Sequence, residues 1–532
     1  MSTQSVWADY EQPDPIRLEI FKHLFASIAE EMGVVLRKSS YSPNIKERRD
    51  FSCAVFDCAG QMIAQAAHIP VHLGSMPLSV AAAVEKFDTS LESGDAILVN
   101  DPFQGGTHLP DLTLVSPVFI KGERMGFVAS RAHHADIGGM TPGSMPVSQE
   151  IYQEGLIIPP VKLAAGDRIN QAVLDIILAN VRTPEERLGD LRAQLAANQR
   201  GVLRLIELIT RYGKTEVSQY MAALLAYTEK MSRRLLAKLP DGVYQFCDAM
   251  DDDGVSCQPV PICVSVTISG DQAVVNFTGS APQQKGSVNA VLAITLSAVY
   301  YVFRCLMGLD VPNNAGCLAP IVVIAPEGSV VNAIRPAPVA GGNVETSQRI
   351  VDVMFGALAQ AAPQLVPAAS QGSMNNVTIG GWDQRRNQPF AYYETMAGGM
   401  GGRPGKAGAS GVHSHMTNTL NTPVEALEFA YPLRVLQYTL RSGSGGNGVY
   451  PGGDGIRRDI QMLTDSQITL LSDRRVTAPY GLAGGSPGVC GENVLVREGV
   501  ESNLPGKGSF QLRAGDILSI RTPGGGGWGK AE

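Results

Sequence analysis

Two neighbouring segments of the sequence, 95–119 and 122–139, read DAILVNDPFQGGTHLPDLTLVSPVF and GERMGFVASRAHHADIGG. Each contains an apolar run of strand length, at 96–99 in the first and at 125–129 in the second, and turn or polar residues follow each run. Polar side chains therefore stand just beyond the ends of predicted strands. They include three of the eight histidines with carboxylates around them: His108, His133, His134, Asp101, Asp111 and Asp136.

These side chains are of the types that bind first-row divalent metals. Pro110, between His108 and Asp111, excludes a helix or a ladder there, but in a turn the imidazole and the carboxylate can converge on one point. Zn, Mn or Fe accepts two neutral imidazoles and one carboxylate, with positions left open for water and substrate. The alternative is a group of polar loop side chains that cap strands and bind no ion. Ligand types alone do not distinguish the two.

Five segments of the chain resemble the hydantoinase B/oxoprolinase family. They read ERRDFSCAVFD (47–57), HLGSMP (72–77), NDPFQGGTHLPDLTLVSPVF (100–119), AHHADIGG (132–139) and TPGGGGWG (522–529). The resemblance extends over nearly the whole chain. It implies a metal-bearing B-type subunit that works beside a separate, ATP-binding A-type subunit. Such complexes are hydantoinases, 5-oxoprolinases or lactamases that open cyclic amides, or carboxylases of acetone or acetophenone.

The expected metal ligands are Asp50, His108, Asp111 and His133. Asp50 stands before the apolar run FSCAVF, at the start of another predicted strand. The resemblance supports a carboxylate from this segment and leaves Glu47 as the alternative. It also places the second histidine ligand about 25 residues after the first, which favours His133 over His134.

Three further residues are expected to take part in catalysis: His134, Asp136 and Arg131. If the backbone stays extended, His134 points away from its neighbour His133 and is expected to support the ligands or transfer protons. Arg131 is a candidate to bind phosphate, since a guanidinium matches a phosphate bidentately.

Other polar residues near this region keep two interpretations. Arg48 and Arg49 could bind phosphate or form ordinary surface salt bridges. His68 and His72, on either side of a proline, line the pocket or are hydrogen-bonded loop histidines.

The composition is that of a globular chain with an α+β fold. The 532 residues are 44% hydrophobic and 17% charged, enough for a large core. We expect an α/β metal-binding region over 1–165, a helical segment over 166–240 and a strand- and glycine-rich region over 241–532. The formal net charge of −7 and the lack of a long basic run argue against nucleic-acid and anionic-membrane partners.

Several elements can be predicted directly. Asp14 and Pro15 form a helix start, and the capping-box pattern at 183–186 begins a long amphipathic helix that a second one follows over about 215–238. We expect these two to be a packing arm or a subunit contact. A hairpin is expected over 264–277 and a buried helix over 289–307. The 58 glycines indicate tight turns, above all in a turn-rich β region near the end of the chain.

The eight cysteines include no CxxC pair, so we expect buried, reduced thiols rather than a disulfide framework or a zinc ribbon. The first 15 residues lack the features of a signal peptide, which predicts a cytoplasmic location. The segment GRPGKA (402–407) resembles a phosphate loop, but alanine replaces the Ser/Thr that would bind magnesium. ATP is therefore expected to act only through the A-type partner, in a hetero-tetramer or larger complex.

The expected function follows from the resemblance and the ligand set. The partner phosphorylates the oxygen of a cyclic amide, and this metal-bearing chain hydrolyses the activated ring. Two alternatives are a subunit of an ATP-dependent ketone carboxylase and a non-catalytic scaffold for the partner. An iron oxygenase with two histidines and one carboxylate is a weaker one.

Overall fold

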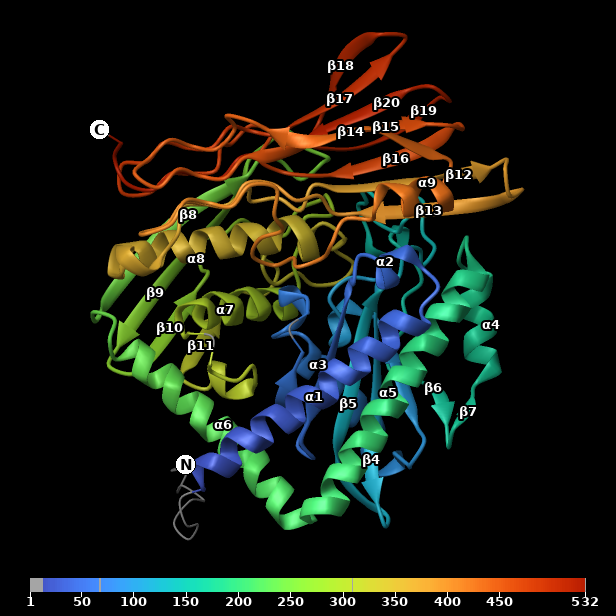
Figure 1. Cartoon of the computed structure of the whole chain (residues 1–532), viewed down its shortest axis with the longest axis vertical. Helices are drawn as coiled ribbons and strands as arrows, with labels where there is room; N and C mark the ends of the chain where they lie inside the picture. Colours follow the sequence, from blue (N-terminus) through green and yellow to red (C-terminus); the bar gives the residue numbers. More distant parts are fainter. Residues whose placement is uncertain (1–12, 67, 309, 532) are drawn as a thin grey trace.

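The computed structural model describes residues 13–66, 68–308 and 310–531. Figure 1 shows the N-terminal strands and long helices in the lower part of the molecule and the C-terminal sheets in a layer across the top. Helices and four sheets occur together, which confirms the α+β class. The domain boundaries at 165/166 and 240/241 stay predictions. Residues 1–12, from which the cytoplasmic location is expected, lie outside the described residues.

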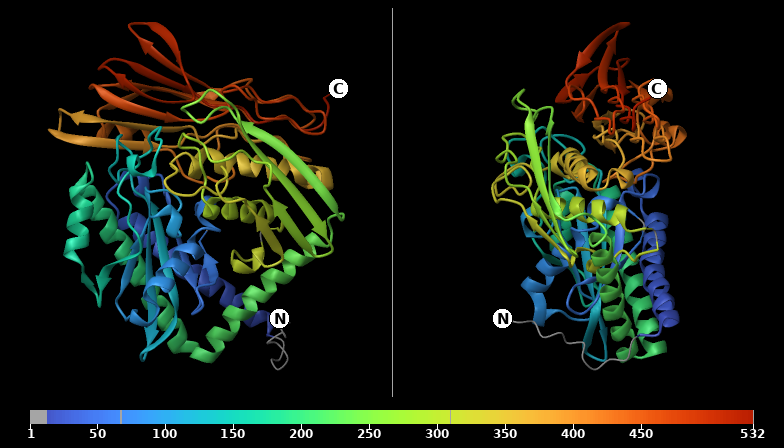
Figure 2. Two further views of the ribbon diagram at one scale, coloured as in Figure 1. Left: turned by 180° about the vertical axis from the view of Figure 1, so that it is seen from behind. Right: turned by 90° about the vertical axis from the view of Figure 1, so that its left-hand side faces the viewer.

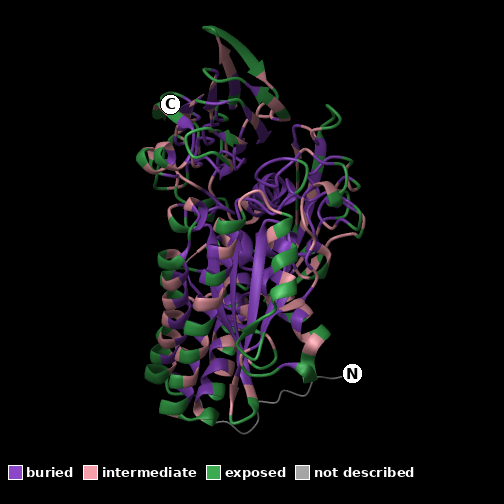
Figure 3. Cartoon of the chain, turned by 90° about the vertical axis from the view of Figure 1, so that its right-hand side faces the viewer, coloured by how far each residue is buried: buried purple, intermediate pink, exposed green. Residues whose placement is uncertain are grey.

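A seven-stranded antiparallel sheet forms the N-terminal part, in the order β2-β1-β5-β4-β3-β6-β7. Its strands are β1 (Phe51–Phe56), β2 (Met62–Gln65), β3 (Ala96–Val99), β4 (Asp111–Ile120), β5 (Glu123–His133), β6 (Val161–Ala165) and β7 (Arg168–Ile169). The central strands β4 and β5 are buried along most of their length, and Figure 3 shows them between helices whose outer faces are exposed. Strands covered on both faces need apolar residues at consecutive positions, which explains the continuous apolar runs.

Long helices from two parts of the chain cover one face of this sheet. They are α1 (Pro15–Ser39) and α5 (Pro184–Tyr212), with the short α2 (Pro43–Lys46) after α1 and α4 (Gln171–Ala179) before α5. The next helix, α6 (Lys214–Leu236), runs from the end of α5 towards the second sheet and packs on α1 and on η5 (Ala315–Leu318). Figure 1 shows α1 and α5 side by side along the sheet, and their contacts agree. The expectation of a packing arm is therefore wrong for α5, which is a core element. Asp14 caps α1 through the N–H of Ile16, whereas the side chain of Thr183 caps nothing in α5.

The other face packs against α3 (Met76–Phe87) and α7 (Leu292–Leu306). The shared core includes Met76, Ile97, Phe127 and Tyr300. The predicted buried helix is therefore confirmed in α7. It reaches the first sheet from a distant part of the chain.

A second sheet has the order β11-β10-β9-β8. Its strands are β8 (Gly242–Met250), β9 (Val260–Ser269), β10 (Gln272–Asn276) and β11 (Ile321–Ile324), and α8 (Ser347–Ala361) packs on β8 and β9. Val266 and Val275 pair across β9 and β10, so the predicted hairpin is confirmed.

The cysteine expectation is wrong in two respects. Cys247 and Cys263 are partners across β8 and β9 and form a disulfide. Cys58, Cys257 and Cys305 are exposed rather than buried. The register of β8 and β9 places these two cysteines opposite each other. The spacing of cysteines in the sequence does not reveal strand register, so it did not indicate the disulfide.

Two further sheets form the C-terminal layer, in the orders β13-β12-β16-β19 and β14-β15-β20-β17-β18. Their strands are β12 (Asn376–Asp383), β13 (Gln388–Glu394), β14 (Leu433–Arg441), β15 (Gly455–Met462), β16 (Ser466–Leu471), β17 (Glu492–Arg497), β18 (Val500–Leu504), β19 (Lys507–Leu512) and β20 (Ile517–Arg521), with α9 (Val424–Ala430) before β14. Residues such as Ile379, Ile460 and Leu518 join them in one core. Figure 2 shows from two further sides that this layer lies at the opposite end of the molecule from the start of α1.

Glycines in the C-terminal part also pack chain against chain, not only in turns. Segments 398–402, 445–453, 481–488 and 524–527 lie against one another, and we call them the polyglycine array. Backbone hydrogen bonds join them, for example from Gly446 N to Gly525 O at 2.8 Å. A Cβ on Gly452 would stand 1.9 Å from the oxygen of Gly525. The array therefore requires glycine for close approach of backbones.

Across the described residues, no helix has both the length and the apolar character needed to cross a membrane.

Candidate metal centre

The β4–β5 hairpin brings an acid and an imidazole together. Asp111 is the first residue of β4 and His133 the last of β5, and in the antiparallel ladder they are Cα partners. Side chains of paired residues lie on one face of a sheet. His108 lies in the turn before β4. The expectation that Asp111 stands on irregular backbone is therefore wrong, although the turn does return His108 to the strand end.

The three side chains converge on a small buried volume. Oδ1 of Asp111 lies 3.2 Å from Nε2 of His108 and 3.3 Å from Nδ1 of His133. One ligand atom from each residue lies within 4.8 Å of the other two, and all three residues are buried. Zinc binds nitrogen and oxygen at about 2.0–2.2 Å, so one ion between the three atoms is of the right size.

The hydrogen-bond partners of these side chains leave two buried acceptor atoms unpaired. Nδ1 of His108 contacts the carbonyl of Ala340 at 3.4 Å, and Asn343 Nδ2 lies 3.0 Å from Nε2, so Nε2 carries the lone pair. Asp111 Oδ1 and His133 Nε2 have no hydrogen-bond partner among the described residues. A buried acceptor without a partner is costly. A cation bound at Oδ1 of Asp111, beside a nitrogen of each histidine, would satisfy that oxygen, so the residues present fit a divalent metal.

The protonation states also suit a metal. Burial by itself would raise the pKa of Asp111, but His108 and His72 beside it hold that pKa well below its usual range. Burial lowers the pKa of His133, which keeps its ring neutral. Metal binding needs an ionised carboxylate and neutral imidazoles.

A cavity of about 20 Å³ adjoins Asp111 and His133. It has room for about one water molecule. Its apolar lining is Ile69, Val71, Val344, Met374 and Met416, and its hydroxyl-bearing lining is Tyr393, Thr395, Thr417 and Thr419. The ring of Tyr393 stacks on His133 with centroids 4.2 Å apart. The walls thus come from both the N-terminal and the C-terminal parts of the chain.

Asp50 lines the same cavity, whereas Glu47 is half-buried and is not part of the lining. The backbone oxygen of Asp50 accepts a hydrogen bond from the N–H of His133, and its carboxylate lies 3.7 Å from Arg48. Its carboxylate is not one of the three grouped ligand atoms. Of the two alternatives, Asp50 is the one that faces the centre.

His72 and His68 have different surroundings in the structure. Nε2 of His72 lies 3.3 Å from Oδ2 of Asp111, and its side chain lines the cavity. The Nδ1 of His68 accepts a hydrogen bond from the N–H of Cys53, and its ring meets Phe51 edge on. Only His72 belongs to the centre.

The three residues expected to be catalytic have partners outside the cavity. Arg131 donates to Thr113 Oγ1 and Ser79 Oγ, both at 2.7 Å. His134 points to the other face of the sheet, as strand alternation predicts, and its Nε2 lies 3.0 Å from Gln194 Oε1 on α5. None of them lines the cavity.

Asp136 pairs with Arg182, whose Nη1 lies 2.9 Å from its Oδ1. It also accepts a hydrogen bond from the N–H of Arg182. These contacts tie the end of the hairpin to the start of α5.

The two candidate phosphate-binding arginines also differ. Arg48 is buried and donates to Thr395 Oγ1 and to the carbonyl of Tyr393, which fixes one wall of the cavity. Arg49 is exposed.

Sequence reasoning missed the C-terminal wall. Asn343 lies in the π-helix η6 (Gly342–Thr346), and Thr395 follows β13. π-Helical turns are frequent at functional sites, but no sequence signal predicts them.

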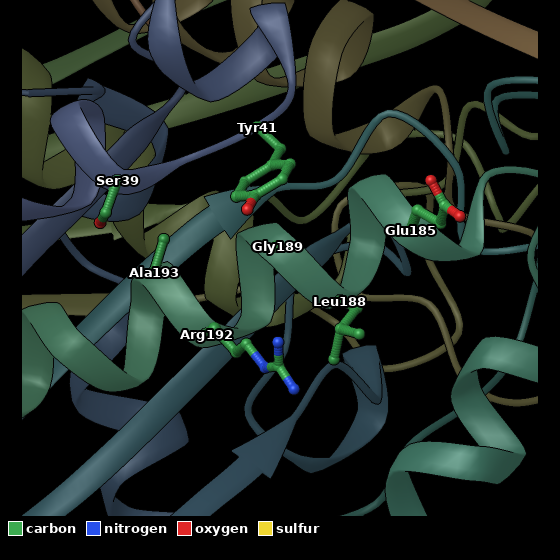
Figure 4. A pocket seen from close by; sticks show the side chains of 7 residues that line it. All are labelled: Ser39, Tyr41, Glu185, Leu188, Gly189, Arg192 and Ala193. Atoms are coloured by element: carbon green, nitrogen blue, oxygen red, sulfur yellow. The ribbon is translucent and has the colours of Figure 1, made fainter.

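Figure 4 shows a larger hollow of about 350 Å³ between the end of α1 and α5. The residues that line it, all labelled, are Ser39, Tyr41, Glu185, Leu188, Gly189, Arg192 and Ala193. It shares no lining residue with the smaller cavity and contains no histidine. The chemistry therefore favours the smaller, buried cavity.

Residues 14–531 match the family described as hydantoinase B/oxoprolinase. The chain belongs to this family. It is 41% identical over 558 residues to 5-oxoprolinase 1 of Arabidopsis thaliana, covering 99% of this chain and 43% of that protein. It is 34% identical over 550 residues to the B-type subunit of a putative D-/L-hydantoinase from a Pseudomonas species, covering 98% of this chain and 91% of that protein. It therefore spans less than half of the oxoprolinase.

Two solved structures share the fold of this chain. The ATP-dependent caprolactamase from Pseudomonas jessenii superposes with a TM-score of 0.91 at 30% identity, over 98% of this chain and 92% of that chain. A nucleotide-free acetone carboxylase also gives 0.91, at 18% identity, over 97% of this chain and 76% of that one. The second likeness concerns the fold alone.

Proposed function

We propose that this chain is the metal-bearing component of an ATP-dependent hydrolase of cyclic amides, of the hydantoinase, 5-oxoprolinase or lactamase type. The convergence of one ligand atom each from His108, Asp111 and His133, all three buried, carries the proposal. These residues would hold zinc or manganese, with Asp50 as the candidate fourth ligand. The ion would supply a Lewis acid and lower the pKa of a water molecule in the cavity.

ATP acts in this proposal only through a separate A-type subunit, within a cytoplasmic hetero-oligomer. The Arabidopsis 5-oxoprolinase has more than half of its length outside the part that this chain matches, and the Pseudomonas relative is named as one subunit of a hydantoinase. Both facts support a second component. Phosphorylation of the amide oxygen there makes the ring carbon a better electrophile. The step left for this chain adds water to that carbon; the ring C–N bond breaks, both protons of the water pass to the nitrogen, and an acyl phosphate remains. A second water then cleaves the acyl phosphate, which releases inorganic phosphate and the carboxylate.

The cavity lining assigns tasks to this chain's own side chains. Arg48 holds Thr395 in place, and the hydroxyls of Thr395, Thr417 and Thr419 can bind polar atoms of the substrate. The apolar side suits ring methylenes. At about 20 Å³ the cavity holds the attacking group but not the ring, so the ring must displace lining side chains as it enters.

Reconstitution with the A-type subunit tests this function. We expect opening of a hydantoin, oxoproline or lactam ring that requires ATP and both chains but no bicarbonate. The isolated chain should bind no ATP in calorimetry. ATP hydrolysis that requires bicarbonate and consumes a ketone would replace the proposal by a carboxylase. Full activity of the complex with Asp111→Ala would leave only a scaffold role.

A further inference from the structure

Two polar groups lie within hydrogen-bonding reach of one carboxylate oxygen of Asp111, Oδ2. Thr107 Oγ1 donates a hydrogen bond to Oδ2 at 2.7 Å, and Nε2 of His72 lies 3.3 Å from the same atom. Oδ1 accepts no hydrogen bond within the described part of the chain. The two oxygens of this carboxylate thus have different surroundings.

The surroundings of His72 assign its tautomer. Ser52 Oγ accepts the N–H of Ile69 at 3.2 Å and lies 2.9 Å from Nδ1 of His72, so its hydroxyl hydrogen is available to Nδ1. A lone pair on Nε2 would face the lone pairs of Oδ2. A proton on Nε2 removes that repulsion and makes His72 a donor to Asp111.

The two donors come from separate segments and are closed off from solvent. His72 ends η1 (Pro70–His72), and Thr107 lies in the turn before β4. Both residues are buried, with at most 1% of their surface exposed, so water does not replace a lost hydrogen bond readily. Each donor therefore constrains the rotation of the carboxylate about its side-chain torsion.

We propose that His72 and Thr107 act as positioning residues that restrict Asp111 to binding the metal through Oδ1 alone. This inference rests on the proposed metal function. A carboxylate that binds through both oxygens would occupy one coordination position more. With Oδ2 held by two donors, that position stays open for water or a substrate oxygen.

Thr107→Val tests the restriction without a change of shape. The variant should bind one equivalent of metal at saturation, with an affinity lowered about 10- to 100-fold in chelator competition. With cobalt(II) as the probe, its visible absorption should weaken, because released Oδ2 raises the coordination number. His72→Leu should change both readouts in the same direction, and His72→Gln, which keeps a donor, should restore them in part.

Two controls separate this role from loss of folding. Thr107→Ser keeps the hydroxyl and should match the wild type. Thr469→Val removes a buried hydroxyl on β16 that lies 2.9 Å from Ser509 Oγ and is not part of the cavity lining, and it should leave metal affinity and spectrum unchanged. A folded Thr107→Val protein with wild-type affinity and spectrum overturns the inference while the metal function stands. A wild type that binds no zinc, manganese or cobalt overturns the proposed function itself.

Discussion

Asp111, the first residue of β4, lies directly opposite His133, the last residue of β5, in the antiparallel ladder. Their separation is set by the ladder rather than by a flexible loop, and both strands are buried between helices. Sites built on rigid elements hold their geometry closely. His108 is the one grouped side chain supplied by a turn, and the carbonyl of Ala340 orients its ring.

Whether a variant retains the metal should depend on whether the replaced side chain lies at the centre, and not on how near it stands to a ligand in the sequence. His108→Ala and Asp111→Ala should each lose stoichiometric metal in elemental analysis, because each removes one of three converging atoms. His134→Ala should retain the metal and lose about 1–3 kcal/mol of stability, since its ring bonds Gln194 on the opposite face. His23→Ala, an exposed histidine bonded to Glu19, is the control. Loss of metal from His134→Ala would contradict the assignment.

Asn343→Ala should tighten metal binding. The amide of Asn343 lies 3.0 Å from Nε2 of His108 and occupies the lone pair that the ion needs. Breaking that hydrogen bond costs about 1 kcal/mol, so its removal should raise the affinity about fivefold in competition titrations. Asn180→Ala, which removes an exposed amide bonded to the carbonyl of Ile176, should have no effect. Weaker binding by Asn343→Ala would mean that the amide supports the metal instead.

Glu345 should make stability depend on pH. Burial, with Asp473 nearby, raises its pKa from 4.5 to about 7, and its Oε2 has no hydrogen-bond partner among the described residues. The folded state therefore favours the protonated form. This preference contributes about 3 kcal/mol to the free energy of unfolding. The contribution is fully present below pH 4.5, the unfolded-state pKa, and is lost as the pH rises to 7, the folded-state pKa.

Glu345→Gln replaces the proton-bearing oxygen by an amide and should remove this part of the pH dependence. Urea unfolding of both proteins at pH 5 and pH 8 measures it. An equal loss of stability in the two proteins over that interval would refute the assignment to Glu345.

Gly452→Ala should destabilise the C-terminal part by about 3 kcal/mol or more, because the new Cβ meets the Gly525 oxygen and backbone must move. Gly443→Ala is the matched control. Gly443 has a φ of +78°, but a Cβ added there would meet no atom within 4 Å, so alanine should cost only about 1 kcal/mol. Thermal unfolding compares the two, and equal shifts would show that close backbone contact is not limiting.

The N-terminal half of the centre could be predicted from the sequence. Apolar runs that end at glycine and proline locate strand ends, and alternation along β5 separates His133 from His134. Arg131 was expected to bind phosphate, because its guanidinium matches a phosphate bidentately. Its long side chain instead reaches α3, where Ser79 accepts its hydrogen bond.

The other half could not be predicted. Asn343 and Thr395 come from elements more than 200 residues after His133, and no local pattern links them. The pairing of Cys247 with Cys263 likewise depends on strand register, which turn length and packing set together.

The polyglycine array has a consequence for synthesis of the protein. Segments 398–402, 445–453 and 481–488 all lie against residues 524–527, which leave the ribosome after the other three. Until that last strip emerges, their backbone N–H and C=O groups lack part of their partners and must stay hydrated or be held by a chaperone. Completion of the C-terminal layer is therefore expected only after residues 524–527 have left the ribosome.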